Sequence, residues 1–394
     1  MHTFSFIFDK AEQDGFPNIA RASCPSIPRL EELLTKSRST PLGLSELAEL
    51  LEIGEAADAG EQFEALRAFV LARWRRPEGN SVRYVAPIYV SSFCIDTCPY
   101  CNFSAARKAT ARKRLTLEEL DAEIEAVLAR DARVIELVYA TDPEFTTDLY
   151  ARYIARTAEA LKNEPGSGVL LCTGYLSREA YDVLRDAGLT GIVQWDETLH
   201  PQAYDHWHAS SPHKREFRLR MDNHDRALAA GLQVATGALF GLADYRYDAL
   251  MQVAKARHLA SEYGRGPFVF GVPRLKPIAG RELHFRTEVS DHAYETILMV
   301  YQIAAPQAGR WLQTRETFET NLRNLLDGDV FTYRCGDVKP GGYHQLETTA
   351  NALRGGQFGV NELERDYVER ELAARNFRIN YAWAENLSGC AIAR

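Results

Sequence analysis

Three cysteines lie within eight residues of one another at positions 94–101, in the order Cys-Ile-Asp-Thr-Cys-Pro-Tyr-Cys. Thiolates spaced this closely on one loop reach three corners of a cubane iron–sulfur cluster, whereas a complete ligand set takes four cysteines. No fourth cysteine lies close to Cys94, Cys98 and Cys101 in the sequence. Because three ligands leave one iron open, the spacing predicts an enzyme whose cluster binds a small molecule. A zinc site or a structural cluster is the alternative, but it would need a fourth ligand in a matching knuckle.

The composition excludes several other classes of protein. The chain has 394 residues, a net charge of −8 and 46% hydrophobic residues, which argues for a large core and against a nucleic-acid surface. The basic run at 107–114 is therefore predicted to be a solvated loop or helix start. The sequence shows no signal peptide and no apolar run long enough to span a membrane. An odd, clustered set of seven cysteines fits a reducing cytoplasm, where we expect the protein to be located.

Alternating strand and helix patterns surround the cysteine loop. Residues 1–80 read as a helical segment, 81–330 as a βα barrel and 331–394 as a carboxyl-terminal cap. The predicted strands are 83–90, 134–139, 169–172, 191–195, 234–240, 268–272 and 310–314. The predicted helices are 115–130, 148–162, 177–187, 218–230, 247–263, 291–304 and, in the cap, 360–375. This rhythm predicts an α/β fold with a parallel TIM-type barrel, complete or nearly so. The cysteine loop follows the first barrel strand, and barrel enzymes carry their chemistry at the carboxyl ends of the strands.

The cysteine spacing, with Tyr100 directly before the third cysteine, resembles the signature of the radical S-adenosylmethionine superfamily. Further landmarks resemble its aromatic amino-acid lyase branch, which includes tyrosine and tryptophan lyases. They are found, in the order that the family has, at 85–94, 100–103, 196–198, 220–231, 237–242, 272–277, 314–316, 340–343 and 357–358. The resemblance implies one [4Fe–4S] cluster on Cys94, Cys98 and Cys101, with S-adenosylmethionine on the open iron. It also implies an external one-electron reductant of the flavodoxin or ferredoxin type.

The resemblance assigns roles to further residues. The residues that it implies for S-adenosylmethionine binding are Tyr100, Thr141, Asp142, Thr173, Glu197 and Arg220. Glu197 and Arg315 are the two candidate catalytic residues, and the family's matching arginine clamps the carboxylate of an amino-acid substrate. The residue type agrees with this role, because a guanidinium donates two parallel hydrogen bonds to a carboxylate. For Arg315 the alternative is an ordinary ion pair with Glu316 or Glu319, and for Glu197 and Arg220 it is a structural ion pair within the barrel.

Several positions depart from the family or remain open. Thr141 and Asp142 stand where the family has Gly-Glu. Asp196 stands in place of a glutamine, and Leu199 stands in place of a tyrosine. These departures indicate a divergent member of the family. His206 and His208 lack a helical metal-ligand spacing and are predicted to be solvated or packed, and Cys172 is predicted to pack in the core. Cys335 could face the barrel mouth, and Cys390 alone cannot build a second cluster.

These observations predict radical cleavage or rearrangement of a free α-amino acid, with tyrosine or tryptophan preferred, in the biosynthesis of a cofactor or natural product. The alternatives are a radical methylase, mutase or sulfur-inserting enzyme acting on a different substrate, and an iron–sulfur electron-transfer or scaffold protein. Neither a nucleic acid nor a membrane is expected as a partner.

Overall fold

The computed structural model describes residues 3–13, 16, 22–108, 110–276, 287–333, 338–344, 356–358 and 363–385. Within these ranges the strands are β1 (Asn80–Arg83), β2 (Ala86–Ser91), β3 (Val134–Tyr139), β4 (Gly168–Cys172), β5 (Gly191–Val193), β6 (Gln233–Gly237), β7 (Val269–Gly271), β8 (Gly309–Leu312), β9 (Val330–Phe331) and β10 (Phe377–Asn380). They form one ten-stranded sheet in the order β10-β1-β9-β8-β7-β6-β5-β4-β3-β2. Every neighbouring pair is parallel.

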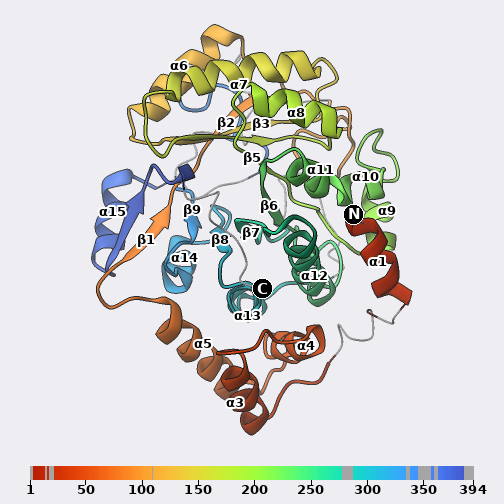
Figure 1. The fold of residues 1–394 in the computed structure, drawn as a ribbon, viewed down its shortest axis with the longest axis vertical. Coiled ribbons are helices and arrows are strands. Elements are labelled where there is room, and N and C mark those ends of the chain that lie inside the picture. Colours follow the sequence, from red (N-terminus) through yellow and green to blue (C-terminus); the bar gives the residue numbers. More distant parts are fainter. Residues whose placement is uncertain are drawn as a thin grey trace.

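The sheet curls into a nearly complete barrel. This follows from β1 and β2, which are consecutive in the chain but lie near opposite ends of the sheet. β1 pairs with β9 and β10, whereas β2 pairs with β3 at the other end of the sheet. Only Tyr84 and Val85 separate β1 from β2, so the chain carries one end of the sheet round to the other (Figure 1). The predicted parallel barrel of the TIM type is therefore confirmed, and it is nearly rather than fully closed.

Helices surround the sheet and pack on its outer face (Figure 1). They are α1 (Phe4–Gln13), α3 (Ile27–Lys36), α4 (Leu44–Glu52), α5 (Gly60–Trp74), α6 (Leu117–Leu128), α7 (Thr147–Leu161), α8 (Arg178–Asp186), α9 (Pro201–His208), α10 (Phe217–Met221), α11 (Asn223–Ala229), α12 (Tyr245–Tyr263), α13 (Asp291–Ala304), α14 (Phe318–Asn324) and α15 (Arg365–Ala373). The amino-terminal helices form an additional layer, in which α4 packs against α12 and α13 and α5 packs against α13.

Local sequence signals explain why these elements form. All six residues of β3 are buried, as expected for a parallel strand that is covered on both faces. Thr116 and Glu119 form a capping box at the start of α6, in which each side chain hydrogen-bonds the other residue's backbone N–H. Such caps fix where the helix begins, and hence where the preceding loop must end.

The end of the barrel opposite the cysteine loop is filled by apolar side chains. Val85, Val134 and Leu170 belong to one buried cluster that also includes Trp383 from the carboxyl-terminal segment. The Trp383 indole Nε1 donates a hydrogen bond of 2.8 Å to the backbone oxygen of Tyr84. Because this end is packed solid, the remaining space in the barrel opens at the carboxyl ends of the strands.

The structure differs from the sequence-based prediction in several places. The strand predicted over 83–90 is divided between β1 and β2, and α9, α14 and β9 were not predicted. The helix predicted over 218–230 is divided into α10 and α11 at Asp222, whose backbone leaves the helical region at φ −85° and ψ 6°. The Asp222 carboxylate instead accepts a hydrogen bond from the backbone of Ser5. In addition, β10, from the predicted cap at 331–394, joins the sheet beside β1. Among the described residues, no helix is long and apolar enough to cross a membrane.

Candidate active site

One cavity at the carboxyl ends of the strands collects nearly all of the predicted site residues. Those lining it are Cys94, Cys98, Tyr100, Cys101, Thr141, Thr173, Glu197, Arg220 and Arg315. Asp142 is the exception. The cavity holds about 1350 Å³ of space, including the part that is open to solvent.

The cysteine loop is held in place by hydrogen bonds from several loops around it. The backbone N–H of Ile95 donates to the oxygen of Thr141 at 3.0 Å, which ties the loop to the end of β3. Asp96, inside the cysteine motif, accepts hydrogen bonds from the backbone N–H groups of His213 and Lys214, each at 3.0 Å. Gln357 donates to the Cys101 sulfur at 3.8 Å. These contacts tie the cysteine loop to the end of β3 and to residues 213–214, and they tie the Cys101 sulfur to Gln357.

The three thiols are electrostatically coupled. Burial, followed by the charges of Cys98 and Cys94, raises the pKa of Cys101 to about 12. The pKa values of Cys94 and Cys98 are also raised, chiefly by burial. Thiols with such values hold their protons at neutral pH, and iron binding displaces those protons. The loop therefore fits a cluster that compensates the charge of three neighbouring thiolates.

Glu197 lies between two cations at the edge of the cavity. Its carboxylate forms ion pairs with Lys214 and, at 3.3 Å, with Arg220. Burial raises the pKa of Glu197, but the positive charges of Lys214 and Arg220 outweigh it and bring the value to about 2. Glu197 also has a φ of +68°, a left-handed conformation that costs a non-glycine residue about 1 kcal/mol or more. The conformation is retained because the Glu197 backbone oxygen accepts a hydrogen bond from Leu239.

Arg220 has donors left for a further anion. Its Nη2 bonds the backbone oxygen of Trp195 at 2.5 Å and the Glu197 carboxylate at 3.3 Å. Nε and Nη1 are buried and have no hydrogen-bond partner in the part of the chain that the structure describes. Buried donors of a charged group are costly to leave unsatisfied. This site therefore fits a carboxylate such as the one that S-adenosylmethionine carries.

The other predicted cofactor residues lie on neighbouring strand ends. The Tyr100 hydroxyl is 2.5 Å from His208 Nε2, and the ring is buried. Thr173 follows β4, and its hydroxyl is 2.8 Å from the Tyr150 hydroxyl. His208 is thus a packed histidine, as predicted: burial lowers its pKa to about 3, so it stays neutral.

Asp142 points away from the cavity into an ion pair. Arg114 donates to both of its oxygens at 2.8 Å, and the Ser91 hydroxyl donates at 2.5 Å. The prediction that 107–114 is a solvated loop is wrong for this part of the run. Arg114 pairs with the buried Asp142, and Arg112 donates to the backbone oxygens of Ser92, Phe103 and Ser104 around the cysteine loop. A contact between Asp142 and the cofactor stays a prediction.

Arg315 lines the cavity just beyond β8 without an acidic partner. No ion pair or hydrogen bond joins its guanidinium to a described residue, and its Nε is buried and unsatisfied. The guanidinium carbon lies 3.8 Å from the centre of the Phe358 ring. Burial lowers the pKa of Arg315, as expected for a cation without a counter-ion. The alternative of an ion pair with Glu316 is wrong, because Arg274 holds that carboxylate.

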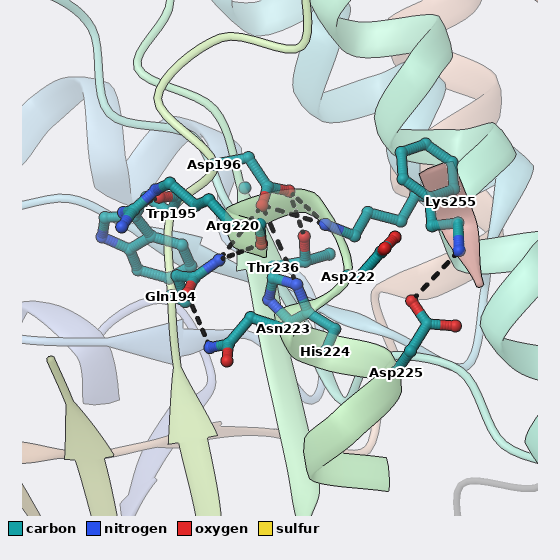
Figure 2. Close-up of polar contacts among 12 residues, drawn as sticks. Gln194, Trp195, Asp196, Arg220, Asp222, Asn223, His224, Asp225, Thr236 and Lys255 are labelled. Atoms are coloured by element: carbon teal, nitrogen blue, oxygen red, sulfur yellow. Dashed lines mark hydrogen bonds and ion pairs between the residues drawn. The ribbon is translucent and has the colours of Figure 1, made fainter. Parts of the chain in front are cut away.

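A buried polar network anchors the strand end beneath Glu197 (Figure 2). Lys255 Nζ lies 2.9 Å from both oxygens of Asp196, and Thr236 and Gln252 donate to the same carboxylate. His224 Nδ1 is 3.8 Å away. Asp196 itself does not line the cavity, whereas its neighbours Trp195 and Glu197 do. The network therefore fixes the backbone from which Glu197 reaches the site.

Sequence reasoning missed three residues that line the cavity. Lys214 and Asp96 gave no signal, because their partners become neighbours only in the folded chain. Glu136 did give one, since it is a carboxylate within the otherwise apolar strand β3. Cys172 packs against two buried clusters, as predicted, and also lines the cavity. Cys335 and Cys390 lie outside the described residues.

Comparisons with known proteins agree with this geometry. Residues 88–255 match the family model described as the radical SAM superfamily. The 2-iminoacetate synthase of Escherichia coli (strain K12) is 29% identical over 283 residues, which is 71% of this chain and 72% of that protein. The crystal structure of HydG, a maturase of the [FeFe]-hydrogenase, has a TM-score of 0.82 and 26% identity, covering 96% of this chain and 81% of that one. Methylornithine synthase (PylB) shares the fold, with a TM-score of 0.70 and 19% identity. The match covers 90% of this chain and 99% of that one.

The chain therefore contains a radical SAM domain, with a [4Fe–4S] cluster and S-adenosylmethionine as its cofactors. Its similarity to 2-iminoacetate synthase and HydG agrees with the aromatic amino-acid lyase branch. Cys94, Cys98 and Cys101 are the residues that would hold the cluster, and the unsatisfied donors of Arg220 suit the second cofactor.

Proposed function

We propose that this enzyme cleaves or rearranges a free α-amino acid, with L-tyrosine or L-tryptophan as the preferred substrate. The observation that carries the proposal is Arg315, which faces the same cavity as the cluster cysteines. Its guanidinium has a buried, unsatisfied Nε and no acidic partner among the described residues. A buried charge of this kind is stabilised by a ligand that supplies the opposite charge and fills its hydrogen bonds. The carboxylate of an amino acid does both.

The residues of this chain divide the work between binding and exclusion of water. When bound, the cluster and S-adenosylmethionine supply a 5′-deoxyadenosyl radical that takes a hydrogen atom from the substrate, with one electron from an external flavodoxin or ferredoxin. Arg315 holds the substrate carboxylate, while Glu197, Lys214 and Arg220 provide paired charges at the other side of the cavity. The aromatic walls, which include Tyr89 and Trp311, keep water from the reacting atoms.

Anaerobic reconstitution tests the proposal. The protein is loaded with iron and sulfide, reduced with dithionite, and given S-adenosylmethionine with L-tyrosine, L-tryptophan or no amino acid. We expect at least one amino acid to increase the yield of 5′-deoxyadenosine and to produce p-cresol, 3-methylindole or an indole acid, detected by mass spectrometry. Equal yields of 5′-deoxyadenosine with and without every amino acid would refute it, in favour of a methylase, mutase or sulfur-inserting enzyme acting on another substrate.

A further inference from the structure

Glu136 is an acid in an unusual position on the inner face of the barrel. It lies in the middle of β3, whose other residues are Val134, Ile135, Leu137, Val138 and Tyr139. Its side chain is 7% exposed, and it lines the same cavity as the cluster cysteines and Arg315. A carboxylate on a fully buried strand is costly unless something in the protein or a ligand satisfies it.

No cation of the described chain satisfies Glu136. The other acids around the site are held by ion pairs or hydrogen bonds: Glu197 by Lys214 and Arg220, Asp196 by Lys255, Asp142 by Arg114, and Asp96 by two backbone N–H groups. Glu136 takes part in no ion pair with a described residue, and its one hydrogen-bond partner is the Cys172 thiol. Burial therefore raises the pKa of its carboxyl group to about 8.

Aromatic side chains line the cavity that Glu136 faces. Pro87, Trp195 and Trp311 line the same cavity. The two indole rings are perpendicular, with centres 5.6 Å apart. Aromatic walls of this kind favour aromatic ligands through edge-to-face and stacked contacts. A carboxyl group in the same cavity offers an oxygen acceptor to a donor at the edge of a bound ring.

We propose that Glu136 determines substrate specificity by accepting a hydrogen bond from a donor on the aromatic side chain of the substrate, a phenol O–H or an indole N–H. The inference rests on the proposed function, because it takes an amino acid held at its carboxylate by Arg315 as the ligand. It adds a second recognition point on β3, between the strands that carry the cysteine loop and Cys172. The substrate is thereby narrowed to amino acids whose ring carries a donor.

Two matched pairs of substrates test this inference. L-tyrosine is compared with L-phenylalanine, and L-tryptophan with L-tryptophan methylated on the indole nitrogen. The second member of each pair lacks the ring donor; the first pair removes the hydroxyl group and the second adds a methyl group, so a size effect would act in opposite directions in the two pairs. The reconstituted holoenzyme is assayed for 5′-deoxyadenosine formation, and each amino acid is titrated by anaerobic calorimetry. We expect the wild-type protein to prefer the donor-bearing member of at least one pair by about 10- to 100-fold in kcat/KM, since an unmade buried hydrogen bond is costly.

Two substitutions at one position separate recognition from packing. Glu136→Leu removes the acceptor and is expected to reduce the preference to about threefold or less. Glu136→Gln keeps an acceptor oxygen and the side-chain size, and is expected to retain most of the preference. Folding of both variants is checked by circular dichroism and by the visible absorption of the cluster. If Glu136→Leu fails to fold, the substrate preference of Glu136→Gln and of the wild-type protein is compared at pH 7 and pH 9. The side chain at position 136 can ionise over that range only in the wild-type protein, so only there is the preference expected to change with pH.

The outcomes distinguish this inference from the proposed function. If an amino acid stimulates 5′-deoxyadenosine formation but both members of each pair act equally, Glu136 recognition is overturned and the proposed function stands. The same holds if Glu136→Leu keeps the full preference, or if the pH comparison shows no difference between Glu136→Gln and the wild-type protein. If no amino acid stimulates turnover, the proposed function fails and the inference fails with it.

Discussion

Substitution of Arg315 by methionine gives the sharpest test of the substrate site. The side chain is half-buried, and its Nε is shielded from solvent. The guanidinium lies over the Phe358 ring and has no hydrogen-bond or ion-pair partner among the described residues. Its removal therefore breaks no internal ion pair and relieves the cost of a buried cation. We expect the stability of Arg315→Met to equal or exceed that of the wild-type protein.

Substrate binding is expected to respond in the opposite way. Truncation of one partner in a buried, hydrogen-bonded charge pair costs about 2–5 kcal/mol. At about 1.4 kcal/mol per tenfold change, this loss weakens the affinity for the amino acid by about 30-fold to several thousand-fold. Arg315→Lys keeps the charge but not the two-pronged geometry, and its loss of affinity should be smaller.

The assay pairs binding with unfolding, and Arg274→Met provides the matched control. Arg274 holds the buried carboxylate of Glu316, so its removal leaves that carboxylate with the longer, 3.4 Å contact to the half-exposed Lys276. The change is expected to destabilise the protein by about 3 kcal/mol. Amino-acid affinity is measured by anaerobic calorimetry in the presence of S-adenosylmethionine, and stability by thermal unfolding. The reasoning is refuted if Arg315→Met binds the amino acid like the wild-type protein, or if it unfolds as early as Arg274→Met.

Three further predictions concern the cluster, the buried network and pH. Cys98→Ser should lower the bound iron and reduce 5′-deoxyadenosine to background, and intact visible absorption of the cluster would contradict its role as a ligand. Lys255→Met leaves Asp196 buried without its cation and should cost about 3–5 kcal/mol in urea unfolding, while Asp196→Asn in the same protein should recover part of that loss. Burial raises the pKa of Asp248 to about 8, so its folded form keeps a proton that the unfolded chain loses near pH 4. The contribution of Asp248 to the free energy of unfolding is therefore lost as the pH rises from about 4 to about 8. Between pH 5 and pH 8, the free energy of unfolding of Asp248→Asn should fall by roughly 3 kcal/mol less than that of the wild-type protein. A variant with the same pH profile as the wild-type protein would refute this assignment.

Much of the fold could be predicted because its signals are local. The β3 strand is a short run of apolar residues, and α6 begins at a capping box, so each element is visible within a few residues of sequence. The cysteine loop could be placed at the barrel mouth for the same reason, since it directly follows a strand. The break of the predicted helix at Asp222 was not visible, because it depends on a contact with Ser5 at the distant amino terminus.

The site could be predicted only where the residue type and its place after a strand were sufficient. Arg315 is an example, because a guanidinium just beyond a strand end lies at the mouth of a barrel. Lys214 could not be found, since it lies on a loop and reaches Glu197 only through the fold. Similarly, nothing in the basic run at 107–114 shows that Arg114 holds Asp142.

The pairing of Asp196 with Lys255 has an evolutionary consequence. Both side chains are fully buried, so a change at either position alone leaves one charge without its partner. The aromatic amino-acid lyase branch that this sequence resembles has a glutamine at the position of Asp196. We therefore expect a relative with that glutamine to carry an uncharged residue at the position of Lys255. The two positions should change together among relatives, and chimeras that exchange only α12 or only the end of β5 should fold poorly. Lys255 lies on α12 and does not line the cavity, so we expect this paired change to follow from packing of the barrel and not from the choice of substrate.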